Sequence, residues 1–280
     1  PYPRTDQARQ RDVKFISASE PEYVLSPQEC RHSTLYMEKR AVQGEPTVFS
    51  ETFEYTSCGE WHNLRAEDVL PYDTTTALYK EYTAEREKHI VFSPRLRELA
   101  AKLTAGETNP YLKAKRIFRW INDHFPWASA REYSTIENIP EYVLDNRHGD
   151  CGQVSLLFIT LCRISGIPAH FQSGFMMHPR AWNLHDWAEV YFEGVGWVPV
   201  DQSFGIPAFA RNADEEYFFL GGIDSWRMIV NTDYGMPLVP EKKYPRSETV
   251  DFQRGEVEWE GGNLYFPQWS YHMDIDYLNY

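Results

Sequence analysis

The sequence has no long hydrophobic run and few positively charged residues. The first absence argues against a membrane span, and the second argues against nucleic acid as a partner. Its longest apolar-rich run, from Val154 to Leu161, is interrupted by Ser155 and Thr160 and falls short of the roughly 18 residues of a membrane span. The chain has 28 basic and 41 acidic residues, for a net charge of -13. Nucleic acid is bound mainly through Lys and Arg, so we expect neither a membrane span nor a nucleic-acid partner.

Cysteine is also scarce, with four residues among 280. That number is too small for a disulfide scaffold at this length. Cys30 and Cys58 either pair in an oxidising compartment or remain two reduced thiols, and the sequence leaves both alternatives open. Hydrophobic residues make up 42% of the chain, which is enough to bury a large core.

Apolar spacing predicts helices first and an antiparallel sheet afterwards, which is an α+β arrangement. Residues 1–45 are polar and are expected to form a loosely structured arm, and residues 47–55 alternate as one exposed strand does. Helices are predicted to begin at Ser93-Pro94 and Asn109-Pro110, where an N-cap residue precedes a proline. Residues 154–162 are apolar nearly all round, which predicts a third, buried helix that Gly166-Ile167-Pro168 ends.

Strand-like runs follow the buried helix at residues 169–175, 185–192 and 197–201, with later candidates at 226–231 and 257–259. A turn at residues 193–196 joins the second and third runs as a hairpin. The pattern predicts three consecutive segments: an N-terminal arm and accessory region at 1–90, a core at 91–210, and a β-rich extension packed on that core at 211–280.

A cysteine, a histidine and an aspartate occur in an order that suits nucleophilic catalysis, since a thiol needs a base and the base needs an orienting group. Cys151 stands at the first turn of the buried helix, where the helix dipole lowers a thiol pKa. The charge of Asp150 opposes this effect, unless Asp150 caps the helix and turns toward backbone N–H groups. Gly149 and Gly152 are expected to leave room for a substrate beside the sulfur.

His185 and Asp201 fall on the two strands of the hairpin, so strand register decides whether they meet. A two-residue loop at Gly194-Val195 would place Asp201 on the face opposite His185. A three-residue loop or a bulge would place both on one face, with Asp201 diagonally next to His185 when Trp187 is its cross-strand partner. The catalytic interpretation therefore predicts an odd loop or a bulge.

Three blocks closely resemble the transglutaminase-like superfamily, whose core has the papain-like cysteine hydrolase fold. They are Gly149-Asp150-Cys151-Gly152 with Arg163-Ile164-Ser165-Gly166-Ile167-Pro168-Ala169, then His185-Asp186-Trp187-Ala188-Glu189-Val190-Tyr191, and then Gly196-Trp197-Val198-Pro199-Val200-Asp201. The resemblance covers residues 90 to 205, and it implies Cys151 as nucleophile, His185 as general base and acid, and Asp201 as orienter. We expect no metal and no cofactor. Asp186 stands where many members have Ala, and Gln202 where Pro is common.

The resemblance implies acyl transfer on the amide of a peptide, protein or glycopeptide through a thioester. Water as acceptor makes a peptidase, amidase or deamidase, and a lysine amine makes a transglutaminase. A binding or structural module without turnover and a glycopeptide amidase are the alternatives. Likeness to bacterial extracytoplasmic members implies a periplasmic or secreted protein, with a leader preceding the sequence given.

Further residues are candidates for supporting roles. The backbone N–H of Cys151 is one oxyanion donor, and Trp127 or Tyr133 is the candidate for a second, although plain core packing is the alternative for Trp127. Met176 and Trp182, in the loop before His185, are candidates for flanking the substrate, as is Trp187 two residues after it. For the loop, packing on its own apolar residues is the alternative.

Overall fold

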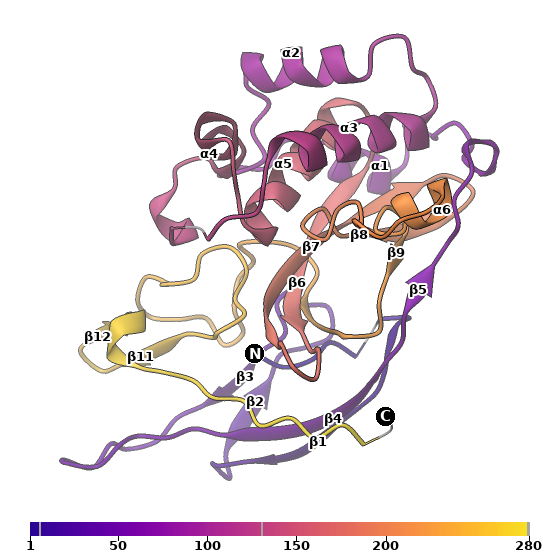
Figure 1. Ribbon diagram of the computed structural model, residues 1–280. Helices are drawn as coiled ribbons and strands as arrows, with labels where there is room; N and C mark the ends of the chain where they lie inside the picture. Colours follow the sequence, from indigo (N-terminus) through magenta and orange to yellow (C-terminus); the bar gives the residue numbers. More distant parts are fainter. Residues whose placement is uncertain (6, 130, 279–280) are drawn as a thin grey trace. The chain divides into compact units, whose positions relative to one another are not determined.

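The computed structural model describes residues 1–5, 7–129 and 131–278 (Figure 1). The chain forms two compact units, each assembled from separate stretches of sequence. The first unit consists of Pro1–Cys58, Ser173–Leu184 and Ser225–Tyr280, and the second of Gly59–Gln172 and His185–Asp224. This division differs from the three consecutive segments expected from the sequence, because the chain leaves the second unit and returns to it.

The N-terminal region of the first unit is built from paired strands. β1 (Gln10–Ala18) pairs antiparallel with β4 (Glu51–Ser57), and β2 (Tyr23–Leu25) pairs with β3 (Leu35–Met37). The expectation of a loose arm over residues 1–45 is therefore wrong. Most side chains of β1 are not buried, so its sequence shows little apolar alternation. Its partner strand β4 lies far along the chain, so the pairing has no local signal either. The strand predicted at 47–55 is present but begins at Glu51.

Of the remaining strands of the first unit, β6 (Ala169–Met176), β10 (Arg227–Asn231) and β11 (Val257–Trp259) match predicted ones, whereas β12 (Gly262–Leu264) was not predicted. β10 pairs with the Ser173–Met176 part of β6, and β11 pairs with β12. A short 3₁₀ helix, η3 (Phe266–Gln268), follows. The core of this unit is a buried apolar cluster with partly buried residues packed against it. Its buried members are Phe175, Met177, Met228 and Val230.

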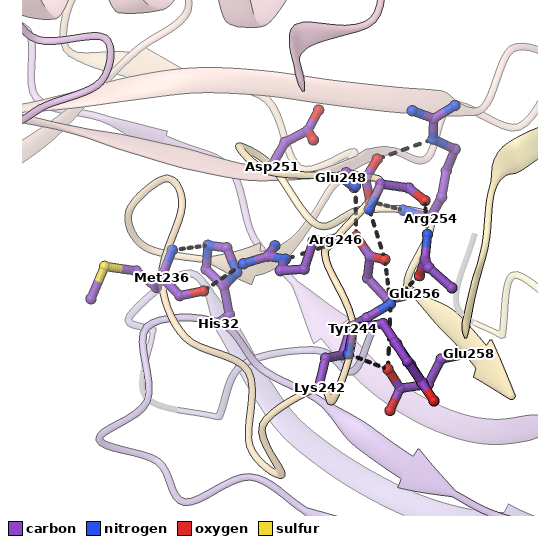
Figure 2. A network of polar contacts seen from close by, with 12 residues as sticks. His32, Met236, Lys242, Tyr244, Arg246, Glu248, Asp251, Arg254, Glu256 and Glu258 are labelled. Carbon is purple, nitrogen blue, oxygen red and sulfur yellow. Dashed lines mark hydrogen bonds and ion pairs between the residues drawn. The ribbon is translucent and has the colours of Figure 1, made fainter. Parts of the chain in front are cut away.

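A network of charged side chains ties down the loop-rich segment between β10 and β11 (Figure 2). Lys242 Nζ lies 3.0 Å from Glu256 Oε2, and Glu256 also accepts the backbone N–H groups of Ser247 and Glu248. Arg254 Nε donates to Glu248 Oε1 at 3.0 Å. The two glutamates are almost fully buried. Such charge-assisted hydrogen bonds order a segment that has little secondary structure of its own.

Helices dominate the second unit. They are α1 (Ala77–Tyr82), α2 (Pro94–Leu103), α3 (Pro110–His124), α4 (Ile139–Asn146), α5 (Cys151–Ile164) and α6 (Ala213–Glu216), with 3₁₀ turns η1 (Ala66–Asp68) and η2 (Tyr133–Thr135). Ser93 and Asn109 cap α2 and α3 as predicted. Helix α4 was not predicted, although its start at Asn138, followed by Pro140, carries a similar cap-and-proline signal.

Helix α5 forms the centre of this unit, in contact with α2, α3 and α4 (Figure 1). Its residues from Gly152 to Arg163 are all buried, as its apolar sequence predicts. The β6 segment Ala169–Gln172 continues the chain, followed by β7 (Asn183–Phe192) and β8 (Gly196–Val200), which pair antiparallel. β5 (Glu60–Trp61) pairs with β9 (Gly222–Ile223). Helices and an antiparallel sheet confirm the α+β class.

Candidate active site

The β7–β8 hairpin has the register that the catalytic interpretation requires. Its partners run from Phe192 opposite Gly196 to Ala188 opposite Val200. The connection is therefore the three residues 193–195, and Gly194 supports its turn with a φ of +88°, which glycine adopts without strain. One further step of the same register places Asp201 opposite Trp187, diagonally next to His185. The expectation of an odd loop is confirmed.

His185 and Asp201 form a buried pair at the end of this hairpin. His185 Nε2 lies 2.7 Å from Asp201 Oδ2, and the two residues are 5% and 0% exposed. Asp201 is held in place by its own backbone, whose N–H donates to Phe219 O at 2.9 Å. Its second carboxylate oxygen accepts the N–H of Phe204. A hydrogen bond at Nε2 fixes the orientation of the His185 ring.

A capping box positions Cys151 at the first residue of α5. The Asp150 carboxylate accepts the N–H of Gln153 at 3.1 Å, and the Gln153 side chain accepts the N–H of Asp150 at 3.3 Å. The prediction that Asp150 caps the helix is confirmed. This reciprocal arrangement fixes the helix start and therefore the direction in which the sulfur leaves the backbone.

The Cys151 thiol forms a hydrogen bond with Asp186, the residue directly after His185. Cys151 Sγ donates to Asp186 Oδ2 at 3.4 Å. The Tyr133 hydroxyl donates to Asp150 Oδ1 at 2.6 Å and lies 3.4 Å from Asp186 Oδ2. Two carboxylates and a phenol, contributed by the N-cap of α5, by β7 and by η2, thus lie next to one another at the start of α5.

These groups occupy the space beside Gly152. A Cβ on Gly152 would lie 2.5 Å from Tyr133 Oη and 2.6 Å from Asp186 Oδ2, and one on Gly149 would lie 3.2 Å from the side chain of Gln153. The expectation that the two glycines leave room for a substrate is wrong, because the protein's own side chains use that room. Glycine at 152 is what allows Asp186 and Tyr133 to approach the helix start.

The electrostatics of the thiol also differ from the expectation. Burial of the sulfur raises the pKa of Cys151 well above its usual value, and the charges of Asp186 and Asp150 raise it further. The backbone N–H of Asp186 acts in the opposite direction but does not dominate. The helix start alone therefore does not produce a thiolate here. Burial also raises the pKa of Asp150, to about 6 from 3.8.

Behind His185, one face of the sheet carries a chain of polar contacts. Trp187 Nε1 donates to Gln172 Oε1, and Gln172 Nε2 donates to Glu189 Oε2 at 3.2 Å. Glu189 Oε2 also lies 3.1 Å from His170 Nε2. Trp187 is fully buried, so its proposed contact with substrate is not supported, and it packs beside the His185 ring. Strand alternation predicts that His185, Trp187 and Glu189 share a face of β7. The hydrogen bond between Trp187 and Gln172 was not predicted.

The other candidates are placed differently. Trp127 is 60% exposed, so the alternative of core packing is wrong for it, and its backbone forms a parallel bridge with Gly149. Tyr133 belongs to η2, and its hydroxyl contacts Asp150 at the start of α5. Met176 and Trp182 belong to the first unit, and their contact with a substrate stays a prediction. Cys30 and Cys58 are both free thiols.

Within residues 1–5, 7–129 and 131–278, no group of three or more His, Cys, Asp and Glu side chains is arranged to hold a metal ion. No helix in that part of the chain is long and apolar enough to cross a bilayer.

Comparison with known proteins identifies the core. Residues 97–202 match the family model of the transglutaminase-like superfamily. The chain is 26% identical over 140 residues to the uncharacterised protein YebA of Bacillus subtilis, covering 43% of this chain and 19% of YebA. It is 23% identical over 125 residues to a protein-glutamine gamma-glutamyltransferase of Pseudomonas aeruginosa, covering 41% of this chain and 19% of that protein. The chain thus spans about a fifth of the length of these curated relatives.

A solved structure shares the fold over most of the chain. It is a candidate cysteine protease from Cytophaga hutchinsonii, with a TM-score of 0.54 and 20% identity, covering 81% of this chain and 72% of that one. The recognition of a transglutaminase-like core is confirmed. The comparisons support a cysteine hydrolase or acyltransferase as the general kind of protein.

Proposed function

We propose that the protein is an acyl-transfer enzyme that acts on amide bonds through a cysteine nucleophile. Cys151 is the nucleophile, His185 the general base and acid, and Asp201 the group that orients His185. The observation that carries this proposal is the buried 2.7 Å hydrogen bond between His185 and Asp201, in the same compact unit as a cysteine at a helix start.

The reaction follows from these roles. The Cys151 thiol passes its proton to His185 Nδ1, and the sulfur attacks the amide carbon to form a tetrahedral intermediate. When that intermediate collapses, the C–N bond breaks, the amine leaves with the proton from His185, and a thioester remains. Water or a second amine then attacks the thioester, losing a proton to His185. The sulfur leaves as the thiol when that proton returns, and an acid or a new amide is released.

Charge on the intermediate's oxygen needs hydrogen-bond donors. The backbone N–H of Cys151 lies in the first turn of α5, where N–H groups have no intrahelical partner. Of the two side chains considered as second donors, Tyr133 already donates its hydroxyl proton to Asp150. Trp127 is exposed, and its own backbone is bridged to Gly149, two residues before Cys151, so we favour Trp127 for this role.

The proposal includes alternatives for the acceptor of the acyl group and for the substrate. Hydrolysis makes the protein a peptidase, deamidase or glycopeptide amidase, and attack by an amine makes it a transglutaminase. One of the curated relatives is named a protein-glutamine gamma-glutamyltransferase, which supports testing glutamine side chains first. A location outside the cytoplasm remains part of the proposal. The competing function is a binding module of the same fold without turnover.

A single assay separates these alternatives. Casein is incubated with the protein and a fluorescent primary amine, and amine incorporation, ammonia release and peptide cleavage are followed together. We expect at least one of these activities in the wild type and in Cys30→Ser, which changes a thiol of the other unit. Loss of the activity in Cys151→Ser supports the proposal. Undiminished activity in Cys151→Ser, or no activity and no covalent adduct in any protein, contradicts it.

A further inference from the structure

We propose that Asp186 is a further residue of the catalytic centre, which holds the Cys151 thiol in its protonated form in the resting enzyme. The inference rests on the proposed role of Cys151 as the nucleophile and adds a control on when that nucleophile ionises. Neither the order Cys-His-Asp nor the family match assigns any role to Asp186.

The contact itself carries the argument. Asp186 Oδ2 lies 3.4 Å from Cys151 Sγ, with the sulfur as donor. An ionised carboxylate only accepts hydrogen bonds, so this contact requires the proton to be on sulfur. Asp186 is 1% exposed, which means that water screens its charge poorly. A thiolate at this position would face a carboxylate at close range, and the thiol form avoids that repulsion.

The groups around the sulfur act in the same direction. Asp150 at the start of α5 adds a second carboxylate, and the hydroxyl of Tyr133 on η2 bridges the two acids. The opposing influences are the backbone N–H of Asp186 and the dipole of α5. His185, on β7, is engaged through Nε2 with Asp201. Burial together with the two acids outweighs the opposing influences, since the pKa of the thiol is raised overall.

The glycine at position 152 shows that the contact is built into the fold. Any side chain there would overlap Tyr133 Oη and Asp186 Oδ2, so the helix start is shaped to admit these two groups. Ionisation then depends on a donor that draws the Asp186 carboxylate away from the sulfur. The N–H groups of an incoming amide can supply that donor, so substrate binding and thiolate formation become coupled.

The test is the pH dependence of Cys151 alkylation by iodoacetamide, in a Cys30→Ser, Cys58→Ser background and read by mass spectrometry. Asp186→Asn keeps the shape and the backbone N–H but removes the charge. We expect its alkylation midpoint to fall by about one pH unit or more, so that the rate near neutral pH rises about tenfold. Glu98→Gln, which removes an exposed carboxylate of α2 in the same unit, is expected to leave the midpoint unchanged.

An unshifted midpoint in a folded Asp186→Asn protein overturns the inference. Should that variant fail to fold, Asp186→Ala, which also removes the charge, takes its place: a midpoint below that of the wild type supports the inference, and an equal one contradicts it. The casein assay keeps the two proposals apart. Turnover that survives Cys151→Ser refutes the proposed function whatever the midpoint. An unshifted midpoint in a protein whose turnover requires Cys151 refutes only the role of Asp186.

Discussion

The ring of His185 and the carboxylate of Asp201 are joined by a 2.7 Å hydrogen bond, although the residues are 16 positions apart. The three-residue connection between β7 and β8 makes this contact possible, because side chains alternate across a strand. A change of one residue in that connection would turn Asp201 to the other face. The proposed mechanism therefore depends on a turn that itself performs no chemistry.

Removing the charge of Asp201 tests its role as the orienting group. Asp201→Asn keeps the size of the side chain but no longer stabilises a positively charged His185 ring. We expect turnover to fall about 10²- to 10⁴-fold with the circular dichroism spectrum unchanged. Asp123→Asn, at an exposed position on α3, serves as the control. Turnover within a factor of two of the wild type in Asp201→Asn would remove Asp201 from the mechanism.

Shortening the hairpin connection tests the register directly. Deletion of Val195 leaves a two-residue connection, which moves Asp201 to the face opposite His185. We expect turnover to disappear while the strand content, measured by circular dichroism, is retained. Val195→Ala keeps the length of the connection and is expected to keep the activity. Full activity in the deletion variant would show that the His185–Asp201 contact is not needed.

Asp150 makes the stability of the second unit depend on pH. Its folded pKa of about 6 lies above the ordinary value of 3.8, so the fold favours the protonated acid. Its contribution to stability is therefore complete below about pH 4 and is lost as pH rises through 6. Two units correspond to about 3 kcal/mol as an upper value.

Asp150→Asn is the variant that tests this pH dependence. Asparagine keeps the helix cap but does not titrate, so we expect it to gain stability over the wild type at pH 8 and to match it near pH 4. Urea unfolding across this range measures the difference. Asp150→Ala, which loses the cap, is expected to cost about 1 kcal/mol even at low pH. An equal pH dependence in the wild type and Asp150→Asn would contradict the assignment.

His89 has the opposite effect on stability at acid pH. It is buried, and its Nδ1 accepts the N–H of Ile139 at the start of α4. Burial lowers its pKa from 6.5 to about 4, so the fold favours the neutral ring. Stability is complete above pH 6.5 and is lost as pH falls toward 4, by about 3 kcal/mol in all.

A glutamine at position 89 tests this acid sensitivity. His89→Gln retains an acceptor for Ile139 but cannot take up a proton, so we expect its urea midpoint to change less between pH 6.5 and pH 4. His124→Gln, at an exposed position near the end of α3, should retain the acid sensitivity of the wild type. Equal acid sensitivity in His89→Gln would assign the effect to other groups.

Features set by local chemistry could be predicted from the sequence. Ser93 and Asn109 signal helix starts because a cap and a following proline act over only a few residues. The length of the hairpin connection was left open by the sequence, and only the requirement that Asp201 meet His185 selected the odd loop that the structure has. The start of α4 at Asn138 was overlooked although its signal is of the same kind.

Features set by distant contacts could not be predicted. The pairing of β1 with β4 joins segments more than 30 residues apart, and β1 has no strong apolar pattern of its own. The contact between Cys151 and Asp186 depends on how a helix start meets a strand from elsewhere in the chain. A sequence motif can indicate which residues form such a site. Which charged groups lie near the sulfur depends on the tertiary fold.

Acylation of Cys151 by p-nitrophenyl acetate tests the central claim most directly. The thiol attacks the ester, p-nitrophenol leaves, and an acetyl thioester remains, which mass spectrometry locates and hydroxylamine cleaves. We predict an acetyl group on Cys151 in the wild type, no acetylation of that position in Cys151→Ser, and strongly slowed acetylation in His185→Ala. Equal rates of Cys151 acetylation in the wild type and His185→Ala would contradict the account.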